Sequence, residues 1–168
     1  MEIWDAYYKD GTKANYDLIR GEEIPKGFYH LVCDILVKHI DGTYLLMQRD
    51  FNKETFPGKY EASAGGSSLK GENPLQCAIR ELKEETGITA TSLKQIYHIV
   101  SDEKQRIYYG YLCVVDCDKN SIILQEGETI SYKWMNKDEF LSFFKTDEFA
   151  ESHKERLELY LDKIRLDK

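Results

Sequence analysis

Long apolar runs are missing from this 168-residue chain, in which hydrophobic residues make up 42% and charged residues 32%. No stretch approaches the roughly 20 apolar residues that a membrane-spanning helix needs. The opening segment, MEIWDAYYKDG, lacks the basic start and the apolar stretch of a secretory signal. We therefore expect one globular domain that resides in the cytoplasm and has no membrane partner.

Positive charge is also scarce, because 23 lysines and arginines stand against 30 aspartates and glutamates, which gives a formal net charge of −7. No basic stripe is visible along the chain. This excludes a protein that binds a nucleic-acid polymer by neutralising its phosphates. A small phosphorylated substrate is compatible with the negative net charge of the chain, because a bound metal ion can offset the charge of the phosphates locally.

Four cysteines are present, and none of them forms a CxxC pair: Cys33, Cys77, Cys113 and Cys117. Without a secretory context we expect reduced and largely buried thiols. A zinc site lacks a second pair of ligands at a suitable spacing. The sequence also offers no Ser-His-Asp arrangement, and His30 and His98 have no evident partner for nucleophilic catalysis.

The order of the predicted strands and helices indicates an α/β fold. The Asp10-Gly11 and Asp41-Gly42 dipeptides are hairpin signals, each between two extended segments. Segments rich in strand-forming residues cover 30–38, 43–49, 59–62, 93–100, 106–115 and 131–135, and helical spacing covers 73–87, 136–144 and 151–165. This pattern predicts a mixed sheet covered by helices.

The helix after Glu72 has the clearest boundaries. Asn73 suits the N-cap, Pro74 the first helical position and Gln76 the reciprocal position of a capping box. Gly87 is the expected C-terminal glycine. One side of this helix is expected to pack on the sheet: Leu75, Ala78, Ile79, Leu82 and Thr86.

Carboxylates are crowded on the same helix. At 100° per residue, Glu81, Glu84 and Glu85 lie within about a third of the circumference, opposite the apolar stripe. Like charges at this spacing repel each other, and a bound divalent cation removes the repulsion. All-oxygen ligands favour Mg²⁺, with Mn²⁺ as a substitute. Arg80 can reach Glu84 at the i+4 position and hold a ligand's orientation.

The spacing of the whole segment resembles the Nudix box, whose glycine, glutamate, arginine and aliphatic positions this chain matches at Gly66, Glu72, Arg80, Glu81, Leu82, Glu84, Glu85, Gly87 and Ile88. With each residue type at roughly one in fifteen, seven fixed identities arise by chance on the order of once in 10⁸ placements. A merely solvated acidic face does not explain such a match. One departure is Ala64, where many members carry proline, and it concerns the loop rather than the metal.

The resemblance to the Nudix family implies an α/β/α sandwich with a mixed central sheet. It divides the chain into a hairpin-like extension (1–29), a Nudix core (30–144) and a C-terminal helix (151–165). It also implies a pyrophosphohydrolase that cleaves a nucleoside diphosphate derivative or a related organic diphosphate. In that chemistry water attacks phosphorus, Mg²⁺ holds the phosphate oxygens and lowers the pKa of the water, and a glutamate accepts the proton.

The same resemblance assigns roles to the acidic residues. Glu81 and Glu85 are the expected principal metal ligands, and Glu84 supports them or binds a further ion. Glu72 braces the loop or the helix. Arg80, Glu84 and Glu85 belong to the expected catalytic set.

Members of the family often carry one more carboxylate, as metal ligand or base, shortly before a tryptophan-bearing strand. Glu128 stands at that place and Glu126 is the alternative, while an exposed turn glutamate explains either one equally well. Three further residues are candidates for substrate contacts: Arg49 and Lys59 for phosphate, and Tyr108 for a base or sugar. Two aromatic residues are alternatives for stacking, and strand aromatics commonly pack the core instead: Phe51 and Tyr60.

Residues 1–29 resemble an extension of Nudix members related to isopentenyl-diphosphate isomerase, which introduces an isomerase as a second enzyme class. Those isomerases use a cysteine in the segment before the box, and the segment YEASAGGSS has none. A third class is a nucleotide sensor without catalysis, which we expect to lose the ligand glutamates. The extension is either the arm of a homodimer or a sheet edge.

Overall fold

A computed structural model describes residues 1–166 of the chain and contains two β-sheets. A two-stranded sheet consists of β1 (Ile3–Tyr7) and β2 (Lys13–Ile19). The central sheet has seven strands: β3 (His30–His39), β4 (Tyr44–Arg49), β5 (Tyr60–Ala62), β6 (Ala64–Ser67), β7 (Lys94–Ser101), β8 (Arg106–Val115) and β9 (Thr129–Met135).

The central sheet is mixed, as the sequence predicts. β3 and β8 run parallel over their full length, from the His30–Arg106 pair to the His39–Val115 pair. The other strand pairs that the structure describes in this sheet are antiparallel. The sequence did not predict β6, because its residues Ala-Gly-Gly-Ser have little intrinsic preference for a strand.

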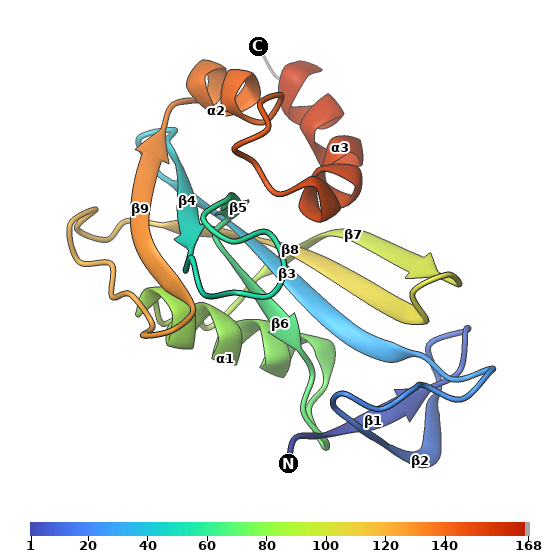
Figure 1. The fold of residues 1–168 in the computed structure, drawn as a ribbon. Helices are drawn as coiled ribbons and strands as arrows, with labels where there is room; N and C mark the ends of the chain where they lie inside the picture. The colour runs from blue at the N-terminus through green and yellow to red at the C-terminus, as the bar shows by residue number, and fades with distance from the viewer. Residues whose placement is uncertain (167–168) are drawn as a thin grey trace.

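Helices cover both faces of the sheet (Figure 1). α1 (Pro74–Thr86) packs on one face, where Ala78 and Leu82 join the apolar side chains of β3. α2 (Lys137–Phe143) and α3 (Glu151–Leu166) pack on the other face. This is the predicted α/β/α sandwich. Among the described residues, no helix combines the length and the apolar character that a membrane crossing requires.

The predicted ends of α1 are confirmed. The Asn73 side chain accepts a hydrogen bond from the Gln76 backbone N–H at 2.8 Å, and the Gln76 side chain accepts one from the Asn73 N–H at 2.9 Å. Gly87 ends the helix with a left-handed φ of 77°.

The predicted apolar stripe of α1 was wrong in part. Leu75 is 38% exposed, whereas the buried side of the helix consists of Cys77, Ala78, Leu82, Glu85 and Thr86. The stripe is therefore rotated, and Glu85 lies on the buried side rather than opposite it. The glycine backbone of β6 leaves room for a carboxylate between the helix and the sheet, because the Glu81 carboxyl group lies where a Cβ atom at Gly66 would stand.

The N-terminal hairpin packs beside one end of the central sheet. The Trp4 ring stacks on the His30 ring with centroids 3.9 Å apart, and Tyr7 and Tyr29 exchange two backbone hydrogen bonds. Burial, followed by the positive charges of Arg106 and Arg20, lowers the pKa of His30 to about 3. His30 is therefore a neutral packing residue at neutral pH, in line with the absence of a catalytic partner in the sequence.

Candidate active site

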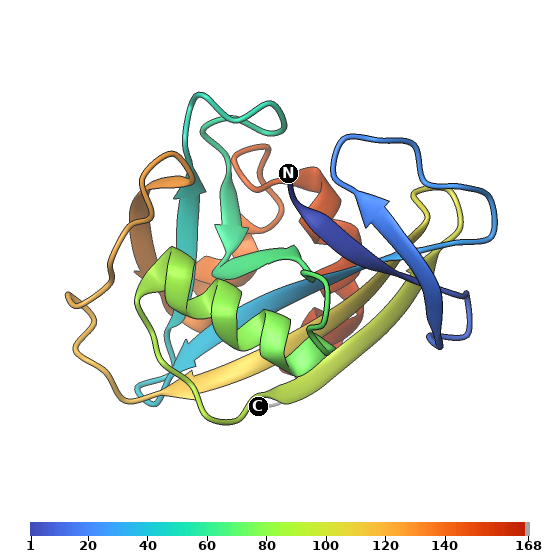
Figure 2. The ribbon, with the colours of Figure 1, turned by 90° about the horizontal axis from the view of Figure 1, so that it is seen from below.

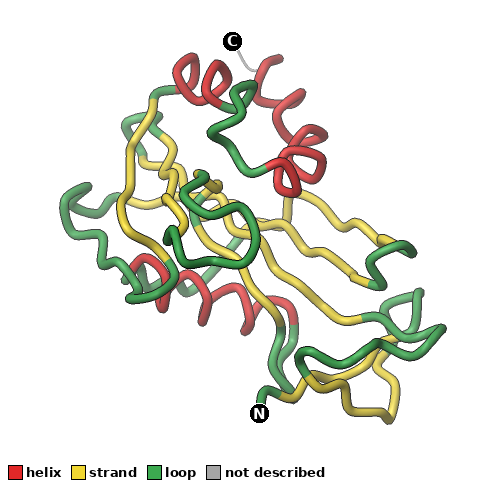
Figure 3. The backbone as a smooth tube through the Cα atoms, in the orientation of Figure 1, coloured by secondary structure: helices red, strands yellow, loops and turns green. Residues whose placement is uncertain are grey.

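The box residues open into a cleft of about 430 Å³. Four parts of the chain that are distant in sequence line it: the N-terminal hairpin, the end of β4 with the loop 50–59, the stretch from β6 through α1, and the end of the loop 116–128. The backbone course of these parts can be followed in Figure 3, where the loops are green. Its lining residues are Glu2, Arg20, Arg49, Lys53, Gly65, Gly66, Ser67, Leu69, Arg80, Glu81, Glu84, Glu85, Gln125 and Glu128. Charged residues thus dominate the lining.

Glu85 is the most deeply placed carboxylate of the cleft, with only 9% of the residue exposed. Burial raises its pKa well above the usual range, and the negative charges of Glu61, Glu81 and Glu128 raise it further. The backbone N–H of Gly65 works in the opposite direction. Four carboxylates therefore lie close enough to repel one another, which is the electrostatic setting in which a divalent cation is stabilising.

Glu81 lies one helical turn before Glu85 and directly against the backbone of β6. A Cβ atom at Gly66 would come within 2.4 Å of the Glu81 carboxyl carbon, so only glycine leaves this space open. Burial raises the pKa of Glu81, although the adjacent Arg80 guanidinium lowers it in part. The box glycine and the box glutamate are thus matched to each other.

Arg80 connects the loop before α1 to the carboxylates. Its Nε and Nη2 donate to the two oxygens of Glu72 at 2.6 and 2.9 Å, and Nη1 donates to Glu81 at 2.7 Å and to Glu84 at 3.2 Å. Burial alone would raise the pKa of Glu72, but hydrogen bonds from Arg80 and from the Leu69 N–H lower it overall. These contacts suit a residue that orients the other carboxylates, and they agree with a bracing role for Glu72.

Two further ion pairs involve residues that line the cleft. Lys53 Nζ lies 2.6 Å from Glu128, and Arg49 Nη1 lies 2.9 Å from Glu61. The sequence pattern predicts a role for Glu128 and for Arg49 but offers no signal for Lys53 or Glu61. Lys53 sits in a polar loop, 75 positions from Glu128, so only the folded chain reveals the pair.

Some predicted site residues lie elsewhere. Lys59 does not line the cleft, and its Nζ donates to the Asp147 carbonyl at 2.5 Å. Tyr108 is 3% exposed and lies under the Arg156 guanidinium on the α3 side of the sheet, so it does not line this cleft. Glu126 does not line the cleft, in contrast to Glu128.

The aromatic candidates for stacking are also placed away from the carboxylates. Tyr60 is buried against Phe143, with Lys133 over its ring. Phe51 is 69% exposed and covers Gly58 within its own loop. Neither ring lines the cleft.

The donor set of the cleft fits a hard divalent cation, because its acidic side chains offer oxygen ligands alone. The ligands are not yet gathered around one point. Over residues 1–166, no three histidine, cysteine, aspartate or glutamate side chains form a ready-made metal site. Glu81 is held by Arg80 and Glu128 by Lys53, so a metal would have to exchange with these cations.

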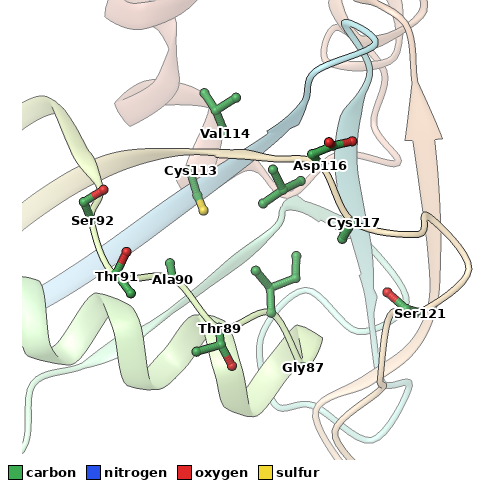
Figure 4. Close-up of a pocket in the computed structure, with 12 residues that line it drawn as sticks. Gly87, Thr89, Ala90, Thr91, Ser92, Cys113, Val114, Asp116, Cys117 and Ser121 are labelled. Atoms are coloured by element: carbon green, nitrogen blue, oxygen red, sulfur yellow. The ribbon is translucent and has the colours of Figure 1, made fainter.

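A second hollow, of about 440 Å³, lies at the C-terminal end of α1, where Gly87 to Ser92 face the end of β8 (Figure 4). Its lining includes Cys113, Cys117 and a single carboxylate, Asp116. With one acidic group and no cationic side chain, it lacks the composition of a metal and phosphate site. The acidic cleft is therefore the stronger candidate for chemistry.

The fold places the chain in a class of α/β/α sandwich proteins known from solved structures. A crystal structure from Deinococcus radiodurans matches with a TM-score of 0.72 at 18% identity, over 89% of this chain and 92% of that one. A bifunctional NMN adenylyltransferase/ADP ribose pyrophosphatase of Francisella tularensis, complexed with AMP and a Mn ion, matches with a TM-score of 0.60 at 22% identity, over 80% of this chain and 42% of that one.

The family follows from the sequence comparisons. The family model described as the NUDIX domain matches residues 29–160. A Nudix hydrolase of Listeria monocytogenes is 31% identical over 153 residues, which cover 89% of this chain and 88% of the relative. The chain belongs to the Nudix hydrolase family, as its box predicts.

The close approach of Gly66 and Glu81 leads to a test of the site. In Gly66→Ala, the new methyl group occupies the position of the Glu81 carboxylate. Because that carboxylate is the mobile end of a side chain, it shifts while the fold stays intact. We expect a loss of metal-dependent turnover of about a hundredfold, typical of a displacement near 1 Å, with little change in Tm.

The matched control is Ser67→Ala, which also changes the cleft lining but leaves the Ser67 carbonyl on Arg80 in place. Steady-state kinetics and thermal unfolding of both variants decide the matter. Equal turnover in Gly66→Ala and in the wild type would show that the reaction does not depend on the position of the Glu81 carboxylate beside Gly66.

Proposed function

We propose that the protein is a hydrolase that uses Mg²⁺ or Mn²⁺ to cleave a diphosphate linkage in a nucleoside diphosphate derivative or related organic diphosphate. The observation that carries the proposal is the convergence of Glu81, Glu85 and Glu128 on one cleft from separate parts of the chain. The Francisella structure, which holds AMP and a Mn ion, supports it as a relative in fold.

Glu81, Glu85 and Glu128 are the side chains that would hold the ion, with Glu84 at the exposed rim for support or for a further ion. A bound divalent ion supplies positive charge to phosphate oxygens and makes water a better nucleophile. Arg80 fixes the direction of Glu81 and Glu84 from the side. Arg80 thus orients two of these carboxylates, and binding of an ion by Glu81 and Glu128 requires exchange of the Arg80 and Lys53 ion pairs.

The remaining groups divide the work of binding and proton transfer. Arg49 and Lys53 place positive charge at the rim next to the carboxylates, where they can receive phosphate oxygens. Glu84, Glu85 and Glu128 are the carboxylates that can accept the proton of the attacking water. Glu84 is the most exposed of the box carboxylates, with 44% of its side chain in contact with solvent, so solvent reaches it directly.

A substrate screen tests the proposal. We expect Mg²⁺-dependent release of phosphate or a nucleoside monophosphate from at least one member of a panel, with loss of release on chelation. The panel comprises nucleoside triphosphates, oxidised nucleotides, ADP-ribose, dinucleoside polyphosphates, nucleotide sugars and isoprenoid diphosphates. Release is followed by phosphate colorimetry and by chromatography.

The other functional classes are alternative outcomes of the same screen. If every compound stays intact with both Mg²⁺ and Mn²⁺, the hydrolase is contradicted and a nucleotide sensor is favoured. Conversion of isopentenyl diphosphate without release of phosphate would identify an isomerase. The segment before the box contains no cysteine, and Cys33 and Cys77 are both buried beneath it, which disfavours that outcome.

A further inference from the structure

The N-terminal hairpin contributes two side chains to the lining of the cleft, Glu2 and Arg20. In Figure 2 the N-terminus lies on one side of β6 and α1, and the loop that leads into β9 lies on the other. The hairpin thus forms one side of the cleft, with residues that are not part of the box motif. No feature of the sequence pattern placed residues 1–29 at the cleft.

The hairpin is fixed to the loop between β6 and α1 rather than lying free beside it. The Lys70 N–H donates to the Ile3 carbonyl at 3.0 Å, and the Gly71 N–H donates to Asp5 at 2.7 Å. Leu69 packs into the apolar core of the hairpin. The position of the hairpin relative to the box is therefore set by direct contacts with the box loop itself.

Arg20 is held in a way that leaves most of its donors open. Its Nη1 donates to Glu2 at 3.0 Å, and the second oxygen of Glu2 accepts a hydrogen bond from the Trp4 indole N–H at 2.7 Å. Within the described part of the chain, Glu2 is the sole side-chain partner of this guanidinium. With 63% of the Arg20 side chain exposed, its remaining N–H groups face the solvent of the cleft region.

The other cations of the cleft differ from Arg20 in their partners. Arg80, Lys53 and Arg49 are each paired with one of the converging carboxylates or with a box residue. Arg20 is paired only with a residue of its own hairpin. Its carboxylate partner is Glu2, so Arg20 is not engaged by the carboxylates that are expected to hold the metal.

We propose that Arg20 binds a further phosphate of the substrate, outside the diphosphate that the carboxylates and their metal hold. This proposal rests on the proposed function and narrows it to substrates with at least three consecutive phosphates. A guanidinium binds phosphate through two parallel charge-assisted hydrogen bonds, and Arg20 has the open donors to do so. The cleft volume of about 430 Å³ lies within the range of about 300–1,000 Å³ common for small-molecule sites.

Binding of two inorganic probes tests the assignment without requiring turnover. Imidodiphosphate and diimidotriphosphate differ by one phosphate and resist hydrolysis. We expect the wild type, with Mg²⁺, to bind the three-phosphate probe at least about tenfold more tightly, because the extra phosphate gains charge-assisted hydrogen bonds from Arg20. Arg20→Gln should remove this preference and leave binding of the two-phosphate probe unchanged in calorimetric titrations.

The matched control is Lys26→Gln, which removes the same charge from an exposed residue that does not line the cleft. It should retain the wild-type preference. The role of Arg20 is contradicted if Arg20→Gln prefers the three-phosphate probe as strongly as the wild type does, or if the wild type has no such preference. Either result leaves the proposed hydrolysis in the substrate screen unaffected. If neither probe binds in the presence of Mg²⁺, the proposed diphosphate site and the role of Arg20 both fall.

Discussion

Replacement of Glu85 by glutamine is expected to reduce metal-dependent turnover by about 10²- to 10⁴-fold and, in the metal-free protein, to raise Tm. The two effects have one cause. Glu85 is a nearly buried carboxylate whose pKa is raised by burial and by three neighbouring carboxylates, so its charged form is disfavoured in the fold without a cation. Glutamine keeps the shape of the Glu85 side chain and removes the free-energy cost of a buried negative charge, but it is a poor ligand for Mg²⁺.

Glu84→Gln provides the comparison, because Glu84 belongs to the same helix but has 44% of its side chain exposed. It should change the metal-free Tm far less. Thermal unfolding with and without Mg²⁺, combined with steady-state rates, separates the two variants. Full turnover in Glu85→Gln would remove Glu85 from the metal site and contradict the proposed function.

The features that the sequence predicted well are those with local causes. Asn73, Pro74, Gln76 and Gly87 determine the ends of α1 through contacts within four residues, so the pattern alone was sufficient. Apart from β6, the strands of the central sheet carry enough apolar residues to be recognised one by one. The mixed sheet followed from their order.

The features that the sequence missed depend on pairs far apart in the chain. β6 exists because Ala64 to Ser67 pair with β3, and its glycine at position 66 leaves the space that the Glu81 carboxylate occupies. Lys53 and Arg20 are ordinary surface cations until the fold brings them to the cleft. Tyr108 lies away from the cleft because an aromatic residue in a central strand commonly packs the core.

A buried ion pair joins β3, the strand that pairs with β6, to α3 on the other face of the sheet. Arg156 donates to both oxygens of Asp34, at 2.6 and 3.0 Å, and the Tyr97 hydroxyl donates to Asp34 at 2.7 Å. Burial alone would raise the pKa of Asp34, but the charges of His153 and Arg156 and the hydrogen bonds lower it. Asp34 pairs across the sheet with Gly65, the residue whose backbone N–H faces Glu85.

Arg156→Met is therefore expected to lower the free energy of unfolding by about 3–5 kcal/mol at neutral pH, because it leaves Asp34 buried and without its guanidinium partner. In the wild type the lowered pKa keeps Asp34 ionised in the fold, and the stability it contributes is lost only as the pH falls below its ordinary value of 3.8. In Arg156→Met the Asp34 carboxyl group takes up a proton more readily, because the guanidinium that stabilises its charged form is gone. The difference in the free energy of unfolding between the wild type and Arg156→Met should thus become smaller as the pH falls from 7 toward 4.

Urea unfolding at several pH values measures this difference, and the double variant Asp34→Asn/Arg156→Met distinguishes its cause. If the cost comes from an unpaired buried charge, removing that charge restores most of the lost stability. A double variant no more stable than Arg156→Met would mean that the packing of Arg156 over the Tyr108 ring, and not its charge, holds α3 to the sheet. In contrast to Glu85→Gln, which trades activity for stability, Arg156→Met should lose activity only in proportion to the protein that unfolds.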